Sequence, residues 1–531
     1  MIKKGLISII LFVFILNCST VYGKGLQFRD IEESWATEYK FEIYQLSHLG
    51  IIKGYEDNQF KPFKEITREE FIKALISLLN VNLKQNNNQT FKDVSLDRWS
   101  HQYIEHAVSK GIIVPTDYFN RYFQPNKKIT RQEMAVILGR LLKNIRQIKK
   151  VNTINFNDKD KIDNWAISYV SIVTNLGLIK GDNSGNFNPQ KTLTRLETAI
   201  VLNRLLKILN PLEVSAFYAI KSYGQADKIR NLDQVVFGWS SITEDNNGNV
   251  KFTFQDSSSV YRLPEGYEEV IYNKYNNKTE KLLMVFENNT KLLNKLLNDN
   301  YREVVEDISE VVKEYNFDGI TIDFEGIRDR EYNKENFINF LDMLDKELKD
   351  KKLSVAVPPR NVNNYYDGYD FKRIGLIADE VILMAYDYQD KDFLSATAPM
   401  DKIVEAIRDA LIEIPKEKLV LGLQVVEGVQ WRYRKENNEA DKPLYYQPSI
   451  DKVYKSLKEK NGNVEFNYSF MMPVFVYEDE QEKNIIIYEN ESSVKSKILA
   501  AKYFGIKGIA LWRLGIIQKD IWNVIKSNNI N

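Results

Sequence analysis

Residues 317–326, "FDGITIDFEG", place three acids in and beside a short apolar run that is typical of a β-strand. Side chains alternate along a strand, so Thr321, Asp323 and Glu325 share one face while the apolar residues between them share the other. Charged groups on a buried face are costly unless they are paired or serve a purpose. The stretch therefore indicates either a surface strand with an acidic outer face or a buried strand that carries a functional site.

The C-terminal part of the chain, about 212–531, contains eight short apolar runs, most of them separated by amphipathic helical patterns. These runs are "VSAFYAI" (214), "DQVVFGWSSI" (233), "KLLMVFEN" (281), "GITIDFEG" (319), "LSVAVPPR" (353), "DEVILMAYDY" (379), "KLVLGLQ" (418) and "GIALWRLG" (508). Eight such units predict a (β/α)8 TIM barrel, whose strands are buried on both faces. A doubly wound open sheet is the alternative, but no glycine-rich phosphate loop follows the first run.

In such a barrel the active site lies at the carboxyl ends of the strands. Glu325 ends the fourth strand, and Asp323 lies two residues earlier on the same face. An acid with little water and an acidic neighbour has a raised pKa, so it can act as a general acid near neutral pH. Two carboxylates on one strand cannot flank a sugar from opposite sides, so the arrangement favours a reaction in which the substrate supplies the nucleophile.

The motif resembles that of glycoside hydrolase family 18, which carries Asp-x-x-Asp-x-Asp-x-Glu on its fourth strand. Here it begins at Asp318 and ends at Glu325, and it is accompanied by "MAYDY" at 384–388 and by Trp512. The resemblance implies no metal or organic cofactor. It also implies substrate-binding roles for five residues, Asp318, Thr321, Met384, Asp387 and Trp512.

By this resemblance Glu325 would protonate the glycosidic oxygen and later activate water. Asp323 would hold the N–H of the substrate's 2-acetamido group, whose oxygen would attack the anomeric carbon and give net retention. Tyr386 would hydrogen-bond that oxygen, with Asp387 nearby, and Trp512 would form an apolar floor under the sugar.

Thr321 departs from the family pattern, which has a second Asp there. An uncharged residue at 321 should let Asp323 ionise more readily. The form "DGITIDFEG" resembles the branch of the family that acts on peptidoglycan-derived glycans. This tilts the expected substrate toward cell-wall N-acetylglucosamine linkages and away from chitin.

The first 210 residues repeat themselves. Units opening with "FRDIEESWA" (28), "FKDVSLDRWS" (91) and "FNDKDKIDNWA" (156) each end in a Thr-Arg-x-Glu motif. Such self-similarity predicts stacked helical units, and the Thr and Glu of each motif form an N-terminal capping box. The expected domains are a signal peptide at 1–23, repeats at 28–84, 91–145 and 156–209, and the barrel at 212–531.

The arginine of each motif is not explained by capping, because a cation in the first turn opposes the helix dipole. It indicates either a structural ion pair or an anion site. The three units resemble S-layer homology domains, an all-α assembly that binds pyruvylated secondary polysaccharide of Gram-positive cell walls. The resemblance implies wall-polymer binding by Arg68, Arg131, Arg195, Gly54 and Gly181. The second unit has Val114-Pro115 in place of a Lys-Gly pair, so we expect two good sites and one degraded site.

The composition narrows the function further. Equal numbers of basic and acidic residues, 73 each, give no support to a general nucleic-acid or anionic-membrane binder. A basic start, an apolar core and the small-residue site Val21-Tyr22-Gly23 predict a secretory signal peptide, and no later segment is apolar enough to cross a membrane. One cysteine, Cys18, and three histidines leave thiol chemistry and a His-based metal site poorly supported.

These observations predict a secreted, wall-anchored retaining hydrolase of a Gram-positive-type cell surface. It would cleave β-1,4 linkages next to N-acetylglucosamine in peptidoglycan-type glycans or chitin. The alternatives are a catalytically weak, lectin-like carbohydrate-binding barrel and a structural S-layer component.

Overall fold

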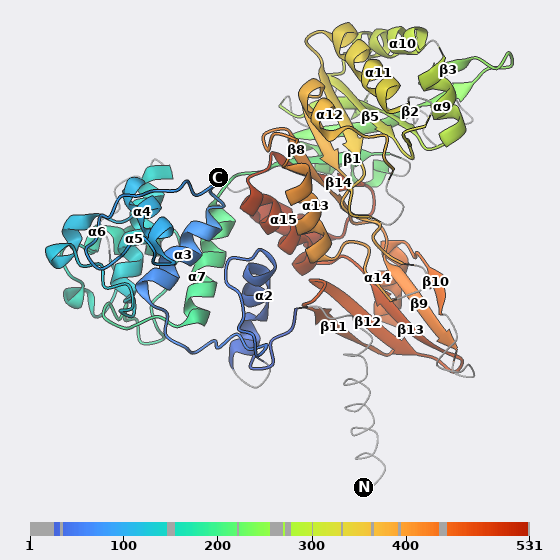
Figure 1. Cartoon of the computed structure of the whole chain (residues 1–531). Helices are drawn as coiled ribbons and strands as arrows, with labels where there is room; N and C mark the ends of the chain where they lie inside the picture. The colour runs from blue at the N-terminus through green and yellow to red at the C-terminus, as the bar shows by residue number, and fades with distance from the viewer. Residues whose placement is uncertain are drawn as a thin grey trace. The chain divides into compact units, whose positions relative to one another are not determined.

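A computed structural model describes eleven stretches of the chain. They are residues 26–31, 35–145, 154–219, 222–254, 269–270, 278–299, 301–330, 333–362, 366–390, 394–434 and 443–528. The chain divides into two compact units, Leu26–Leu209 and Asn210–Asn531 (Figure 1). The predicted signal peptide at 1–23 lies outside the described residues. Within the described stretches, no helix has the length and apolar character needed to cross a bilayer.

The N-terminal unit is helical and contains the three repeats (Figure 1). Its elements are η1 (Trp35–Tyr39), α2 (Lys40–His48), α3 (Arg68–Leu78), α4 (His101–Ser109), η2 (Pro115–Asp117), η3 (Phe119–Arg121), α5 (Arg131–Ile145), η4 (Lys159–Lys161), α6 (Ile167–Asn175) and α7 (Arg195–Ile208). The last helix of each repeat begins at the arginine of the Thr-Arg-x-Glu motif. In all three repeats the predicted capping box is confirmed, because the Thr hydroxyl accepts from the Glu backbone N–H and the Glu carboxylate accepts from the Thr backbone N–H.

The residues just before these threonines join the three repeats into a ring. The backbone N–H of Ile66 donates to the carbonyl of Leu193, that of Leu193 to Ile129, and that of Ile129 to Ile66. All three side chains are buried. Each repeat therefore completes the hydrogen bonding of another repeat, as expected of units that cannot bury their own apolar faces alone.

The C-terminal unit is a closed barrel of eight parallel strands, and the predicted (β/α)8 fold is confirmed. The barrel strands are β1 (Glu213–Tyr218), β2 (Gln234–Glu244), β4 (Glu280–Glu287), β5 (Gly319–Phe324), β6 (Lys352–Val357), β7 (Glu380–Leu383), β8 (Leu419–Gln424) and β14 (Gly508–Trp512). Strand β1 pairs with both β14 and β2, which closes the sheet. A ninth strand, β3 (Val250–Thr253), pairs antiparallel with β2 outside the barrel.

Helices follow most barrel strands (Figure 1). They are η5 (Ser222–Asn231), α9 (Thr290–Asn298), α10 (Arg302–Glu314), α11 (Asn333–Leu348), α12 (Phe371–Ile377), α13 (Met400–Ala410), α15 (Glu491–Phe504) and α16 (Lys519–Asn528). Because these helices cover the outer face of the sheet, the strands are buried on both sides. This accounts for the near-continuous apolar runs in the sequence.

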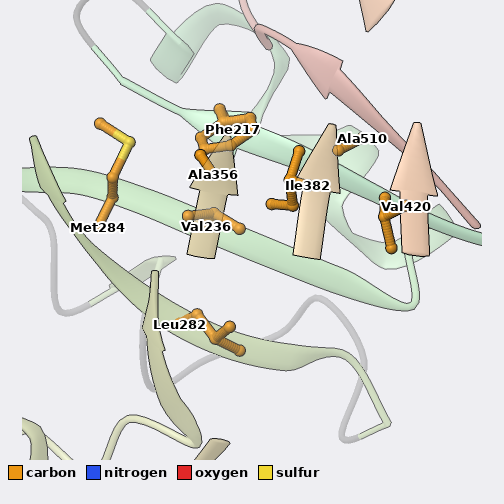
Figure 2. Packing of buried hydrophobic residues seen from close by; sticks show 8 residues of the cluster. All are labelled: Phe217, Val236, Leu282, Met284, Ala356, Ile382, Val420 and Ala510. Carbon is orange, nitrogen blue, oxygen red and sulfur yellow. The ribbon is translucent and has the colours of Figure 1, made fainter. Parts of the chain in front are cut away.

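The barrel interior is filled by buried apolar side chains from seven of the eight strands (Figure 2). They are Phe217, Val236, Leu282, Met284, Ala356, Ile382, Val420 and Ala510. Strand β5 places Thr321 and Asp323 on the same inner face, since these residues pair in register with the inward-facing Met284 and Phe286 of β4. The acidic face of this strand therefore points into the barrel and not into solvent.

The long segment between β8 and β14 forms a second, antiparallel sheet with the order β10-β9-β13-β12-β11 (Figure 1). Its elements are β9 (Val429–Arg434), β10 (Leu444–Tyr446), α14 (Ile450–Glu459), β11 (Gly462–Asn467), β12 (Met472–Glu478) and β13 (Glu482–Ile487). Its own core includes the fully buried Trp431. We call residues 425–490 the insertion domain.

Candidate active site

The acids of the quoted stretch lie at the carboxyl end of β5. Asp323 is 4% exposed, Thr321 is fully buried, and Glu325 is half-buried just beyond the last residue of the strand. The Glu325 backbone N–H donates to the carbonyl of Glu287, 2.8 Å away, which continues the pairing of β5 with β4. One oxygen of Asp323, Oδ1, and the hydroxyl of Thr321 have no hydrogen-bond partner among the described residues. Buried polar atoms without partners are rare in folded proteins and are typical of sites that bind a ligand.

Strand β7 brings Met384, Tyr386 and Asp387 to the same end of the barrel. Met384 packs against the interior cluster. The ring of Tyr386 lies against Gly422 of β8, where a Cβ atom would be only 3.2 Å from Cε1 of the ring. A glycine at 422 therefore makes room for the tyrosine inside the barrel. Asp387 has a left-handed backbone, with φ of 62°; part of the residue is accessible, but its carboxyl group is packed closely enough by protein to be desolvated.

Strand β14 ends at Trp512, which is half-buried and packs against the interior cluster. Its ring meets Phe217 of β1 edge to face, with centroids 5.3 Å apart. The peptide bond between Trp512 and Arg513 is cis. The structure thus places an aromatic ring at the same end of the barrel as the carboxylates.

Burial, with a smaller contribution from neighbouring carboxylates, raises the pKa values of the acids at this end of the barrel. Burial, followed by the charge of Glu325, raises the pKa of Asp323 well above its ordinary value. Burial, followed by the charge of Asp387, raises that of Glu325, and burial also raises that of Asp387. The pKa of Tyr386 is raised well above its usual range by burial and by all three acids. The acids therefore titrate as a linked set that retains protons into a higher pH range than isolated carboxyls do.

The expectation that an uncharged residue at 321 lets Asp323 ionise more readily than a second Asp would stays a prediction. Removing a carboxylate from position 321 does remove one repulsive neighbour, but burial and Glu325 still hold the Asp323 pKa high. The dominant cause is desolvation, which an uncharged neighbour does not relieve.

Asp318 does not belong to this site, and its predicted substrate-binding role is corrected. It precedes the first residue of β5 and so lies at the amino end of the barrel, on the opposite side from the carboxyl ends. Its side chain is exposed, and Oδ2 accepts a hydrogen bond from the backbone N–H of Lys281, 2.8 Å away. Asp318 therefore ties the start of β5 to β4.

Three further residues lie near the acids and were not predicted from the sequence. Glu427 and Tyr445 come from the insertion domain, and Arg513 follows Trp512. Burial and the charge of Asp387 raise the pKa of Glu427, while Arg513 lowers it. Burial raises the pKa of Tyr445 to about 12, with Asp387 and Glu427 adding to the rise. The insertion domain thus lines the site, as expected of a long excursion on a barrel, but its residue types carry no motif that a sequence search could use.

Across the described stretches of the chain, no group of three or more His, Cys, Asp or Glu side chains is arranged to hold a metal ion.

The motif arginines of the helical repeats hydrogen-bond to the backbone of another repeat. In Arg131, Nε donates to the carbonyl of Phe187 (2.7 Å) and Nη2 to that of Lys180 (2.9 Å). In Arg195, Nε donates to the carbonyl of Phe60 and Nη2 to that of Lys53, both at 2.8 Å. The recurring arginine therefore has a structural use, because it binds the turn of another repeat.

Arg68 is bound differently. Its Nη1 donates to the carbonyl of Phe123 (2.7 Å), but its Nη2 pairs with the Glu133 carboxylate. It is 7% exposed, and its guanidinium lies 5.3 Å from the ring centre of Tyr118. The turn beside it, at 114–123, belongs to the second repeat, which is the one with the divergent sequence. Thus two of the three turns have the same arginine geometry and one does not.

Gly54 and Gly181 lie in the two equivalent turns, directly after the carbonyls of Lys53 and Lys180. A Cβ atom at Gly54 would lie 2.2 Å from the ring of Phe28, and one at Gly181 would lie 2.9 Å from that of Phe156. These glycines are explained by the close approach of the phenylalanine that opens the same repeat.

Comparison with known proteins gives matches for both units. The sequence model described as glycosyl hydrolases family 18 matches residues 214–516, and that of the S-layer homology domain matches residues 27–72, 90–135 and 155–199.

Among curated relatives, Exoglucanase XynX of Acetivibrio thermocellus is 34% identical over 196 residues, which is 36% of this chain and 17% of that protein. The Cortical fragment-lytic enzyme of Bacillus subtilis is 26% identical over 250 residues, which is 44% of this chain and 56% of that protein. The chain thus spans less than two thirds of the length of either relative.

Among solved structures, the spore cortex-lytic enzyme SleL of Bacillus megaterium QM B1551 has a TM-score of 0.50 at 19% identity. The match covers 72% of this chain and 86% of that one. At this level of identity the likeness supports the fold.

Proposed function

Because the chain belongs to glycosyl hydrolases family 18 and carries three S-layer homology domains, we propose that it is a retaining glycosidase of the cell wall. It cleaves β-1,4 linkages next to N-acetylglucosamine. The observation that carries the proposal is the pair Asp323 and Glu325 at the carboxyl end of β5, with Tyr386 near enough for its pKa to be raised by both acids and Trp512 at the same end of the barrel.

In the first step the raised pKa of Glu325 keeps a proton available for the glycosidic oxygen. The C–O bond breaks as the acetamido carbonyl oxygen of the same sugar attacks the anomeric carbon. The unpartnered Oδ1 of Asp323 accepts the acetamido N–H and stabilises the positive charge that develops on this group. The Tyr386 hydroxyl donates to the attacking oxygen and orients it.

In the second step Glu325, now a carboxylate, takes a proton from water. The attack of the acetamido oxygen in the first step has closed a five-membered oxazolinium ring. The water attacks the anomeric carbon of this ring and opens it, so the product has the same anomeric configuration as the substrate. Asp323 and Glu325 lie two residues apart on one strand, so these two carboxyl groups cannot flank the sugar from opposite sides. This placement supports a nucleophile supplied by the substrate.

For the substrate we favour peptidoglycan-type glycans over chitin. The support is the named activity of a relative, the cortical fragment-lytic enzyme, together with the uncharged residue at position 321. The wall-anchored location also places the barrel beside peptidoglycan.

Anchoring is assigned to the helical repeats, which hold the chain at a Gram-positive-type cell wall by binding pyruvylated secondary polysaccharide. The turns that Arg131 and Arg195 bind are the favoured sites, since these arginines share one geometry. The turn beside Arg68 is the weakest candidate, because Glu133 already neutralises that guanidinium. Secretion is expected from the signal peptide.

The test compares the purified chain with Glu325→Gln on peptidoglycan and on chitin oligomers. We expect reducing ends from peptidoglycan, with retained anomeric configuration by NMR, and at least a 100-fold loss in the variant. Cleavage of chitin oligomers alone would move the substrate to chitin. No product from either, with oligosaccharide binding kept, would leave a lectin-like barrel.

Anchoring is tested with purified wall polysaccharide, with and without its pyruvate groups. Arg131→Ala and Arg195→Ala should weaken binding to the pyruvylated polymer, and the doubly substituted chain should weaken it most. Equal binding of the depyruvylated polymer would contradict the assignment.

A further inference from the structure

Gln424 is a buried polar residue at the edge of the site that the mechanism above does not use. It is the last residue of β8, and it pairs in register with Trp512 of β14. Since Val420 of the same strand faces the barrel interior, Gln424, four residues on, faces it too. Gln424 is therefore at the carboxyl end of the barrel, one strand away from the tryptophan.

The carboxamide oxygen of Gln424 has no hydrogen-bond partner in the described part of the chain, although the residue is only 7% exposed. Leaving a buried carbonyl oxygen unpaired destabilises a folded protein. The half-buried Gln389, which follows Asp387 by two residues, shares this feature, but the buried Gln234 and Gln430 do not. Gln234 donates from Nε2 to Glu380 and accepts at Oε1 from Lys352. Gln430 donates from Nε2 to Asn484.

The surroundings indicate which ligand group would pair with this oxygen. On the next strand, Tyr386 lies over Gly422, two residues before Gln424. On the other side, about 4.8 Å away across the sheet, is the backbone of Trp512. A sugar that stacks on Trp512 and directs its acetamido group toward Tyr386 would thus have its ring edge beside Gln424. An uncharged acceptor there suits a hydroxyl donor.

We propose that Gln424 contacts the substrate, and that its Oε1 accepts a hydrogen bond from a ring hydroxyl of the sugar stacked on Trp512. This inference rests on the proposed glycosidase function. It adds a specificity-determining contact on β8 to those on β5, β7 and β14. It also explains why folding leaves a buried carbonyl unpaired, since the bound sugar pairs it.

The experiment compares Gln424→Met with Gln430→Met in the full chain. Methionine has a similar length and no hydrogen-bonding amide. For Gln424→Met we expect kcat/KM to fall about 5- to 10-fold, the value of one hydrogen bond. The melting temperature should stay constant or rise, because an unpaired polar group is removed. For the control, which loses a satisfied hydrogen bond in the insertion domain, we expect a lower melting temperature and unchanged kcat/KM.

Substrate analogues identify the hydroxyl. These are oligosaccharides that each lack one ring hydroxyl. The unmodified chain should lose activity on one of them. Gln424→Met should be equally active on that analogue and on the complete oligosaccharide. A Gln424→Met chain with a lowered melting temperature and unchanged kcat/KM would assign Gln424 a structural role and overturn the proposal.

A measurement of oligosaccharide binding distinguishes failure of the Gln424 proposal from failure of the proposed glycosidase function. In the Glu325→Gln background, Gln424→Met should weaken the oligosaccharide Kd by a similar factor, measured by calorimetry. If the unmodified chain hydrolyses nothing, the proposed function fails, and this binding measurement still decides the role of Gln424. If hydrolysis occurs but neither kcat/KM nor Kd changes, the Gln424 proposal alone fails.

Discussion

The two ends of the barrel each bury a carboxylate, and they treat it in opposite ways. At the amino end, Glu380 is 2% exposed, and its oxygens accept from Gln234 (2.9 Å) and from Lys507 (2.8 Å), with the Lys352 ammonium 3.5 Å away. At the carboxyl end, Asp323 is 4% exposed and its Oδ1 has no partner in the described residues. The two residues differ little in burial and greatly in their neighbours.

The pKa values of Glu380 and Asp323 shift in opposite directions because their charged neighbours have opposite signs. For Glu380, burial would raise the pKa, but Lys352 and Lys507 outweigh it and the net shift is downward. For Asp323, burial and Glu325 act in the same direction, and the pKa rises well above its ordinary value. Desolvation alone therefore does not decide whether an inward-facing acid is ionised and stabilises the barrel or keeps a proton. The charges of the neighbouring side chains decide it.

The largest effect should come from Asp323→Asn. Loss of the group that holds the acetamido N–H is expected to lower kcat by about 100-fold or more, measured on the same substrate as Glu325→Gln. The stability of Asp323→Asn should be higher than that of the unmodified chain at neutral pH. A raised folded-state pKa means that the native protein loses stability as pH rises above about 4, the ordinary Asp value.

Asparagine cannot ionise, so the advantage of Asp323→Asn in denaturant melts should grow from pH 4 upward. A variant that is less stable than the unmodified chain at pH 7 would contradict the raised pKa.

Glu380→Gln tests the opposite end. Removing the buried carboxylate leaves Lys352 and Lys507 without their shared partner, and we expect a loss of about 3 kcal/mol in the free energy of unfolding. Because the folded-state pKa is depressed, this stabilisation is fully present above the ordinary Glu pKa, about 4.3, and is lost as pH falls through the lower folded value.

The two melting curves should therefore converge in acid. At pH 7 the kcat of the folded fraction should be unchanged, and a large fall in kcat would mean that the amino end affects catalysis.

Thr321→Asp would sharpen the comparison by adding a second unpaired acid beneath Asp323. Like charges in a dry interior raise one another's pKa, so the alkaline limb of the kcat/KM profile should move up by about one pH unit. The free energy of unfolding at pH 7 should fall by about 1–2 kcal/mol. Thr321→Val is the matched control, with similar shape and no charge, and should leave the limb in place. An unshifted limb in Thr321→Asp would show that position 321 does not influence the acids.

The smallest effect is expected for Glu280→Gln. Glu280 pairs with Lys352 at 2.6 Å, but its side chain is 50% exposed, and Lys352 keeps Glu380 and Gln234. Exposed ion pairs contribute little, so the free energy of unfolding should change by less than about 0.5 kcal/mol. A loss as large as that of Glu380→Gln would show that the network acts as one unit.

Much of this molecule could be predicted because the relevant signals are local. The eight apolar runs became the eight barrel strands, since strands that are buried on both faces need apolar side chains throughout. The threonine caps follow from spacing within one helical turn. The shared face of Asp323 and Glu325 follows from the two-residue period of a strand.

Errors arose where a local pattern was extended across the length of a strand. Asp318 belongs to the same motif as Glu325, but the strand between them carries the two residues to opposite ends of the barrel. The sequence motif of the family does not show which of its residues lie at which end of the barrel, but the direction of the strand does.

The barrel strands, the helix caps of the repeats and the face that carries Asp323 and Glu325 could be predicted from the order of the residues. What each buried polar group contacts depends on how distant parts of the chain pack together. Glu380 gains Gln234 and Lys507 from more than 100 residues away in the sequence, while the charge that acts on Asp323 is that of another acid, and the Gln424 carboxamide oxygen has no donor in the described residues. The physical reason is that a side chain's face is set by its own backbone, but its partners are set by which distant strands close beside it.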